Sequence, residues 1–174
     1  HLEQHGASLV VVGFTISVHI AGMYAFSPIF GWLADKYGKI KTVLLGQTIY
    51  VAALLFAGIG MENEQSVLLG LLLLGLGWSA STVSASALLS SSLPAEQKTN
   101  VQGMSDSLMN LSGALGGAVA GSIMAALMFV GLNLSAMAPV SLILIFTGLT
   151  LLRGRRENAS KNATELENPT TPYM

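Results

Sequence analysis

The chain has 174 residues, of which 52% are hydrophobic and only 10% charged, and its mean hydropathy is +0.63. A soluble domain carries about 25% charged residues, so this composition excludes an ordinary water-soluble domain and favours a protein that faces lipid, where ions are costly. The net charge of −1 gives no basic field for nucleic acid, and a sequence without cysteine excludes disulfides and thiolate metal sites.

Asp, Glu, Lys and Arg are absent from four long stretches, residues 4–34, 42–61, 65–95 and 107–152. About 20 apolar residues form a helix that crosses the hydrocarbon core of a bilayer. The first three stretches therefore hold one span each, and the fourth holds two, which are separated near Gly131, Asn133 and Pro139. The sequence predicts an all-α, polytopic membrane bundle over residues 1–152, with helices at about 7–34, 41–60, 66–91, 101–129 and 135–152.

The first predicted helix carries an ionisable residue at mid-depth, His19, which shares its face at helical spacing with Thr15, Gly22 and Phe26. A histidine there is a candidate carrier of a coupling proton. The alternative is a neutral imidazole that is hydrogen-bonded inside the bundle, and we favour it because no acidic residue lies beside His19 in the sequence. Pro28, near the other end, is predicted to bend this helix.

The stretch GWLADKYGKIKT, residues 31–42, crowds four charges into a short turn: Asp35, Lys36, Lys39 and Lys41. Gly38 is predicted to end the preceding helix in a left-handed conformation, and the lysines favour anionic headgroups. These roles do not explain Asp35, because a carboxylate at a helix C-terminus meets the negative end of the helix dipole. We expect Asp35 to have a partner elsewhere, either a cation or the N-terminus of another helix.

The third predicted helix is unusually rich in small residues. Between Gly75 and Ala87, ten of thirteen residues are Gly, Ala, Ser or Thr. Serines beside a water-filled cavity bind water or substrate. Close packing of helices explains the same composition at least as well.

The fourth predicted helix contains Asp106, the only carboxylate within a span. One face at three- and four-residue spacing holds Gln102, Asp106, Asn110, Gly113, Gly117 and Gly121. The glycines form a repeated small-xxx-small pattern that predicts close approach of another helix. For Asp106, capping of the helix start and a functional contact or gate are nearly even interpretations.

Cations mark the side of the membrane on which each turn lies, because loops rich in Lys and Arg stay in the cytoplasm. The turn after the first helix holds three lysines, and Arg153, Arg155 and Arg156 follow the last helix. The turn after the second helix holds Glu62 and Glu64 and no cation. This alternation predicts an external N-terminus and a cytoplasmic tail over residues 153–174, which its polar composition predicts to be disordered.

The stretch GWLADKYGKIK resembles the signature loop of major facilitator superfamily transporters, G-x-L-x-D-[RK]-x-G-[RK]-[RK]. The matching positions are Gly31, Leu33, Asp35, Lys36, Gly38 and Lys39, and the sequence departs from the pattern at Ile40, where a second cation is common. The resemblance implies that Asp35 is the acid of a conformational latch that pairs with a helix end in the opposite half of the transporter. It makes Lys36 and Lys39 the neighbouring cations of that latch.

Five helices followed by a polar tail fit helices 8–12, the C-terminal half of the fold, and this half is favoured because GFTISVHIAGMYAFSPIFGWLAD resembles helix 8 of bacterial members. Helices 2–6 are the alternative, but the fourth helix has GALGG where the antiporter motif of the first half would need a proline. A C-terminal half implies that helix 7 and a partner N-terminal half lie outside this chain. It also implies that the third helix lines the transport pathway, with Trp78, Ser81 and Ser84 as candidates, and that the glycine face of the fourth helix contacts the other half.

The expected function is secondary active transport of a small solute by alternating access, in a multi-pass protein of the plasma or inner membrane. Proton-coupled efflux is compatible with the family, and no G-x-x-x-x-G-K-[ST] loop for a nucleotide occurs in the sequence. The expected partners are the lipid bilayer, the missing half, a small-molecule substrate and protons, without a cofactor, metal or nucleic acid. The alternative is a non-transport membrane scaffold. An intramembrane enzyme is disfavoured because the spans hold one Asp and one His.

Overall fold

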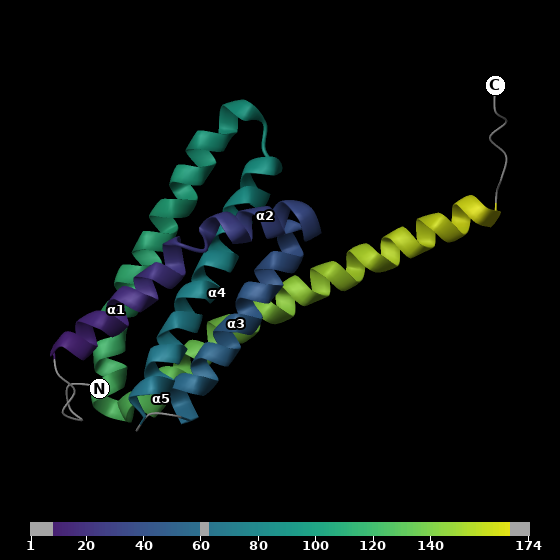
Figure 1. Ribbon diagram of the computed structural model, residues 1–174. Helices are drawn as coiled ribbons and strands as arrows, with labels where there is room; N and C mark the ends of the chain where they lie inside the picture. Colours follow the sequence, from purple (N-terminus) through teal and green to yellow (C-terminus); the bar gives the residue numbers. More distant parts are fainter. Residues whose placement is uncertain (1–8, 60–62, 168–174) are drawn as a thin grey trace.

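The computed structural model describes residues 9–59 and 63–167, and every element in these two ranges is an α-helix (Figure 1). The helices are α1 (Leu9–Tyr24), α2 (Ser27–Tyr37), α3 (Lys39–Ile59), α4 (Glu64–Ser91) and α5 (Ala95–Glu167). Figure 1 shows the α2–α3 and α4–α5 turns at one end of the bundle and a reversal within α5 at the opposite end. Successive segments therefore run up and down.

Within the described ranges, five segments are long and apolar enough to cross a membrane: Leu9–Tyr37, Lys39–Gly58, Gln65–Ser91, Ala95–Met128 and Val130–Gly154. Each of them overlaps one of the predicted spans. The prediction of an all-α bundle with five membrane helices is confirmed, although several boundaries differ from those expected.

The first span is broken where proline was predicted to bend it. α1 ends at Tyr24 and α2 begins at Ser27, with Pro28 in its first turn. Proline has no backbone N–H and is well tolerated at the start of a helix. The N–H groups of Ile29 and Phe30 instead reach the carbonyl of Phe26, at 3.0 and 3.1 Å. Figure 1 shows α2 turning away from the axis of α1, which carries the charged turn to the end of the bundle.

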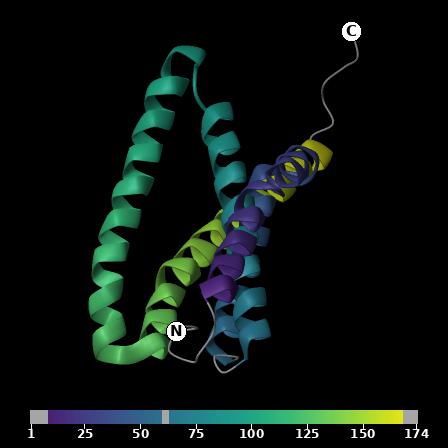
Figure 2. The same ribbon diagram turned by 60° about the vertical axis from the view of Figure 1, so that its left-hand side comes forward.

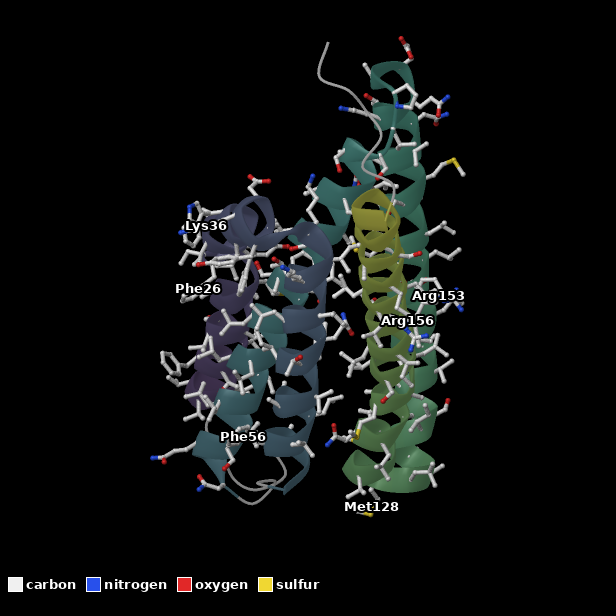
Figure 3. The ribbon with its side chains drawn as sticks, turned by 90° about the vertical axis from the view of Figure 1, so that its right-hand side faces the viewer. Phe26, Lys36, Phe56, Met128, Arg153 and Arg156 are labelled. Carbon is white, nitrogen blue, oxygen red and sulfur yellow. The ribbon has the colours of Figure 1, made fainter. Side chains whose placement is uncertain are left out.

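The fourth and fifth spans are joined by a sharp reversal at Met128, whose φ of 56° and ψ of −166° are non-helical. Figure 2 shows the two arms of α5 both rising from this reversal, so that the chain runs antiparallel in them, and Figure 3 labels Met128 at the same end. A side chain at Gly131 would collide with the side chain of Leu127, so glycine is required directly after the turn. The predicted separation near residues 131–139 is thus displaced by a few residues, and Pro139 lies inside a helix.

The last helix continues beyond the expected end of the fifth span. α5 runs to Glu167, whereas the sequence predicts a disordered tail from residue 153. Figure 1 shows this C-terminal part projecting away from the other helices. Its sequence includes Arg, Glu, Ala and Lys, which have high helix propensity, and a helix that is already formed in the span extends without a new nucleation cost. Residues 168–174 lie outside the described part of the chain.

Helices α3 and α4 pack closely because glycines face each other's backbones. A Cβ at Gly46 would lie 2.8 Å from the backbone nitrogen of Ser81 and 3.0 Å from the carbonyl oxygen of Gly77. A Cβ at Gly77 would in turn lie 3.1 Å from the carbonyl oxygen of Gly46 and from the ring of Tyr50. Backbones can approach this closely only where no side chain intervenes.

A second pair of glycines joins α1 to α4. A Cβ at Gly22 would lie 3.0 Å from the carbonyl oxygen of Leu72, and one at Gly75 would collide with the carbonyl oxygen of His19. The opposite faces of α4 therefore carry close contacts to α1 and to α3. Figure 3 shows these helices grouped on one side, with the two arms of α5 beside them.

We expect the substitution Gly46→Ala to destabilise the bundle, because the new methyl group would meet backbone atoms that cannot move aside. The expected loss is about 1–3 kcal/mol in the free energy of unfolding, the range for overpacked cores. Gly113→Ala is the matched control, because a Cβ at Gly113 would have no atom within 4 Å. Denaturant titration of the detergent-solubilised chain measures both. Equal stability of Gly46→Ala and Gly113→Ala would contradict the close packing of α3 and α4.

Candidate functional site

The charged turn between α2 and α3 has the local geometry that its glycines predict. Gly38 has a φ of 105° and ends α2, and its N–H donates to the carbonyl of Ala34 at 3.1 Å. Its own carbonyl accepts from the backbone N–H of Thr42, also at 3.1 Å. Gly31 is half-buried, and a Cβ there would lie 3.9 Å from Val83 of α4. Gly38 is thus needed for its conformation, whereas Gly31 lies beside α4.

Asp35 is exposed and, within the described ranges, makes no ion pair or side-chain hydrogen bond. Its neighbour Lys36 turns to aromatic rings, with Nζ lying 4.6 Å from the centre of the Trp32 ring and 5.5 Å from that of Tyr37. Both rings are about half exposed and meet edge to face. Lys36 therefore makes cation–π contacts, and the carboxylate of Asp35 has no ion-pair partner among the described residues. Figure 3 shows Lys36 at the outer end of the first group of helices.

His19 binds the backbone of the next helix. Its Nδ1 donates to the carbonyl oxygen of Leu71 at 2.8 Å, because a carbonyl only accepts. The ring is partly buried. This bond joins α1 to α4 close to the contact between Gly22 and Gly75, which supports a packing role for His19. The role of His19 as a proton carrier stays untested.

The three candidates on α4 lie in different environments. Trp78 packs edge to face against Tyr24 of α1, with ring centres 5.8 Å apart. Ser81 accepts a hydrogen bond from Nε2 of Gln47 on α3 at 3.0 Å. Ser84 is fully buried, and its Oγ has no hydrogen-bond partner in the described part of the chain. The structure therefore does not bring the three side chains into one site.

Polar side chains on the first arm of α5 form a connected group. Nε2 of Gln102 donates to Oδ1 of Asp106 at 3.0 Å and lies 3.3 Å from Oγ of Ser86 on α4. Asn110 donates to the backbone carbonyl of Asp106 at 2.8 Å. Asp106 is thus held beside α4 rather than used as a cap for the helix start.

The glycine face of the same arm is open. A Cβ at Gly113, Gly117 or Gly121 would have no atom within 4 Å in the described structure. The predicted contact of this face with another helix stays a prediction, and the close packing seen here uses glycines of α1, α3 and α4 instead.

A cavity of about 410 Å³ lies between α3, α4 and both arms of α5. Gln47, Ser81 and Asp106 contribute polar groups to its lining, and Met109 and Ile143 are among its apolar residues. Gln47 was not singled out from the sequence, although an amide inside an otherwise apolar span is a detectable signal. The described residues hold no group of three or more His, Cys, Asp or Glu that could bind a metal.

The fold and these sites define a multi-pass helical membrane protein with a charged turn after its first span. The sequence matches the Major Facilitator Superfamily over residues 1–173, and the chain belongs to this superfamily. The prediction of the family is confirmed. The assignment to helices 8–12 stays a prediction.

The relatives are bacterial and fungal transporters. The chain is 37% identical over 160 residues to the uncharacterized MFS-type transporter YddS of Bacillus subtilis, covering 91% of this chain and 36% of that protein. It is 36% identical over 135 residues to the uncharacterized MFS-type transporter YdeG of the same organism, covering 77% of this chain and 31% of that protein. A third match, 27% identical over 110 residues, is the vacuolar membrane amino acid uptake transporter fnx2 of Schizosaccharomyces pombe, covering 63% of this chain and 19% of that protein.

The chain thus spans about a third of the length of its Bacillus relatives. No solved structure shows significant similarity to it.

We expect His19→Leu to lower the free energy of unfolding by about 1 kcal/mol, because it removes an interhelical hydrogen bond within the membrane. The matched control is Ser17→Ala, since Ser17 bonds only to the carbonyl of Gly13 in its own helix. Denaturant titration in detergent measures the loss. A stability of His19→Leu no lower than that of Ser17→Ala would show that the bond to Leu71 does not stabilise the bundle.

Proposed function

We propose that the protein to which this chain belongs moves a small solute across a membrane by secondary active transport with alternating access. The supporting observation is the charged turn between α2 and α3, in which Gly38 ends the helix and Lys36 is drawn to aromatic rings. Asp35 is left exposed at the end of the bundle. An unpaired carboxylate is available to bind a second group in one conformation and to release it in another.

In this proposal Asp35 is the acid of a latch and Lys36 and Lys39 are its neighbouring cations. Its partner is a cation or helix N-terminus that approaches only in one of the two conformations. The difference in free energy between latched and unlatched states then biases the conformational equilibrium. Family membership and relatives that are called transporters support this mechanism. Proton-coupled efflux is the form of transport that we propose to test first.

We expect Asp35→Asn, made in the complete reading frame that contains this chain, to reduce turnover about tenfold. A tenfold reduction corresponds to an increase of about 1.4 kcal/mol in the free-energy barrier of the transport cycle. Vesicles with and without a proton gradient are screened with a panel of labelled solutes, and the variant is tested with the solute that moves. Glu96→Gln is the control, because Glu96 is an exposed carboxylate in the first turn of α5. Normal turnover of Asp35→Asn, with equal membrane insertion, would remove the latch role.

The proposed orientation places the α2–α3 turn in the cytoplasm. Because the sequence has no cysteine, single cysteines can be labelled without background. We expect Lys41→Cys to react with a membrane-impermeant maleimide only from the cytoplasmic side and Gln65→Cys only from the outer side. Both positions are exposed, and each lies in the first turn of its helix, at opposite ends of the bundle. Labelling of both from one side would contradict the up-and-down topology, and the reverse pattern would invert the orientation.

A further inference from the structure

Two buried amide oxygens in and beside the cavity between α3, α4 and α5 have no hydrogen-bond partner among the described residues. Gln47 is only 3% exposed. Its Nε2 donates a hydrogen bond to Oγ of Ser81, and its Oε1 has no partner among the described residues. Gln102, beside the cavity, is similar: its Nε2 donates to Ser86 and Asp106, while its buried Oε1 has no partner among the described residues. A buried acceptor without a partner destabilises the folded state, because it has lost its hydrogen bonds to water. A ligand that donates hydrogen bonds would recover this cost.

Charge narrows the class of ligand further. Asp106 lines the cavity and supplies a carboxylate, and only Oδ1 of that group accepts a side-chain hydrogen bond in the described structure. The cavity has no Lys, Arg or His in its lining. The site therefore favours a ligand that is positively charged as well as hydrogen-bond donating.

The size and walls of the cavity indicate an organic ion rather than a bare metal ion. Its volume of about 410 Å³ lies within the range of small-molecule pockets. Apolar side chains form much of the lining, among them Val43, Leu89, Met109 and Ile143. Such walls would pack against a hydrocarbon body, while the carboxylate and the amide oxygen of Gln47 receive its N–H groups.

We propose that this cavity binds a small organic ammonium ion with an apolar body. The further step, that such ions are transported substrates, rests on the proposed function. Binding itself does not require transport and is measured on the complete protein without an ion gradient.

The test is equilibrium binding of radiolabelled phenethylammonium to the complete protein that contains this chain, in phosphatidylcholine nanodiscs, with protein-free discs as the background. We expect saturable binding, competition by unlabelled phenethylammonium, and no competition by the neutral analogue 3-phenylpropan-1-ol. Asp106→Asn should lower the affinity about tenfold or more, the effect of losing a charge-assisted hydrogen bond. Glu96→Gln should bind as the unmodified chain does, because Glu96 lies on the same helix but not in the cavity lining.

Gln47→Leu tests the orphaned amide separately and should also weaken binding, whereas Thr48→Val, at an exposed neighbouring position, should not. Circular dichroism and size-exclusion chromatography verify that each variant folds. Absence of saturable binding, equal affinity of Asp106→Asn and the unmodified chain, or equal competition by the neutral alcohol would each overturn the proposal. Binding without any solute movement in vesicles of the complete protein would leave this site standing and count against the transport function instead.

Discussion

The arrangement of the bundle depends on the close contact of α4 with its two neighbours. Helices in lipid gain little hydrophobic energy by associating, because lipid tails are as apolar as leucine, so van der Waals packing and hydrogen bonds must hold them together. Glycines at positions 22 and 75 bring α1 and α4 together, and glycines at 46 and 77 do the same for α3 and α4. Hydrogen bonds cross these contacts from His19 to α4 and from Gln47 to Ser81, and they favour one relative orientation of the packed helices.

The same contact determines where polar groups come to lie. Packing of α3 against α4 buries Gln47 and places Ser81 on the edge of a cavity that the arms of α5 complete. Asn133 on the second arm of α5 donates to the carbonyl of Leu54 at 2.8 Å, which fixes that arm against α3. The cavity is therefore a consequence of how four segments meet. No short motif in the sequence encodes it.

Hydropathy predicted the five spans because an ion-free stretch of this length has only one low-energy environment. Proline and glycine chemistry located the break at Pro28 and the end of α2 at Gly38, since both residues act locally. The fourth span ends at Met128, within one residue of its predicted end at 129. The fifth span begins at Val130 rather than at 135, because several residues from 131 to 139 offer equally good turn signals. The helical continuation to Glu167 was not predicted, because the polar composition of this segment is typical of disorder although its Arg, Glu, Ala and Lys residues favour a helix.

The sites were harder to predict, because their meaning depends on what lies opposite each residue. Small residues spaced four apart look alike in sequence, yet Gly77 faces a backbone while Gly113 faces nothing in the described structure. Ser81 and Ser84 are three residues apart on α4, but one accepts a bond from α3 and the other has no partner in the described ranges. A polar or small residue in a membrane helix therefore identifies a position that tolerates close contact or a ligand. Only the neighbouring helices decide which of the two it serves.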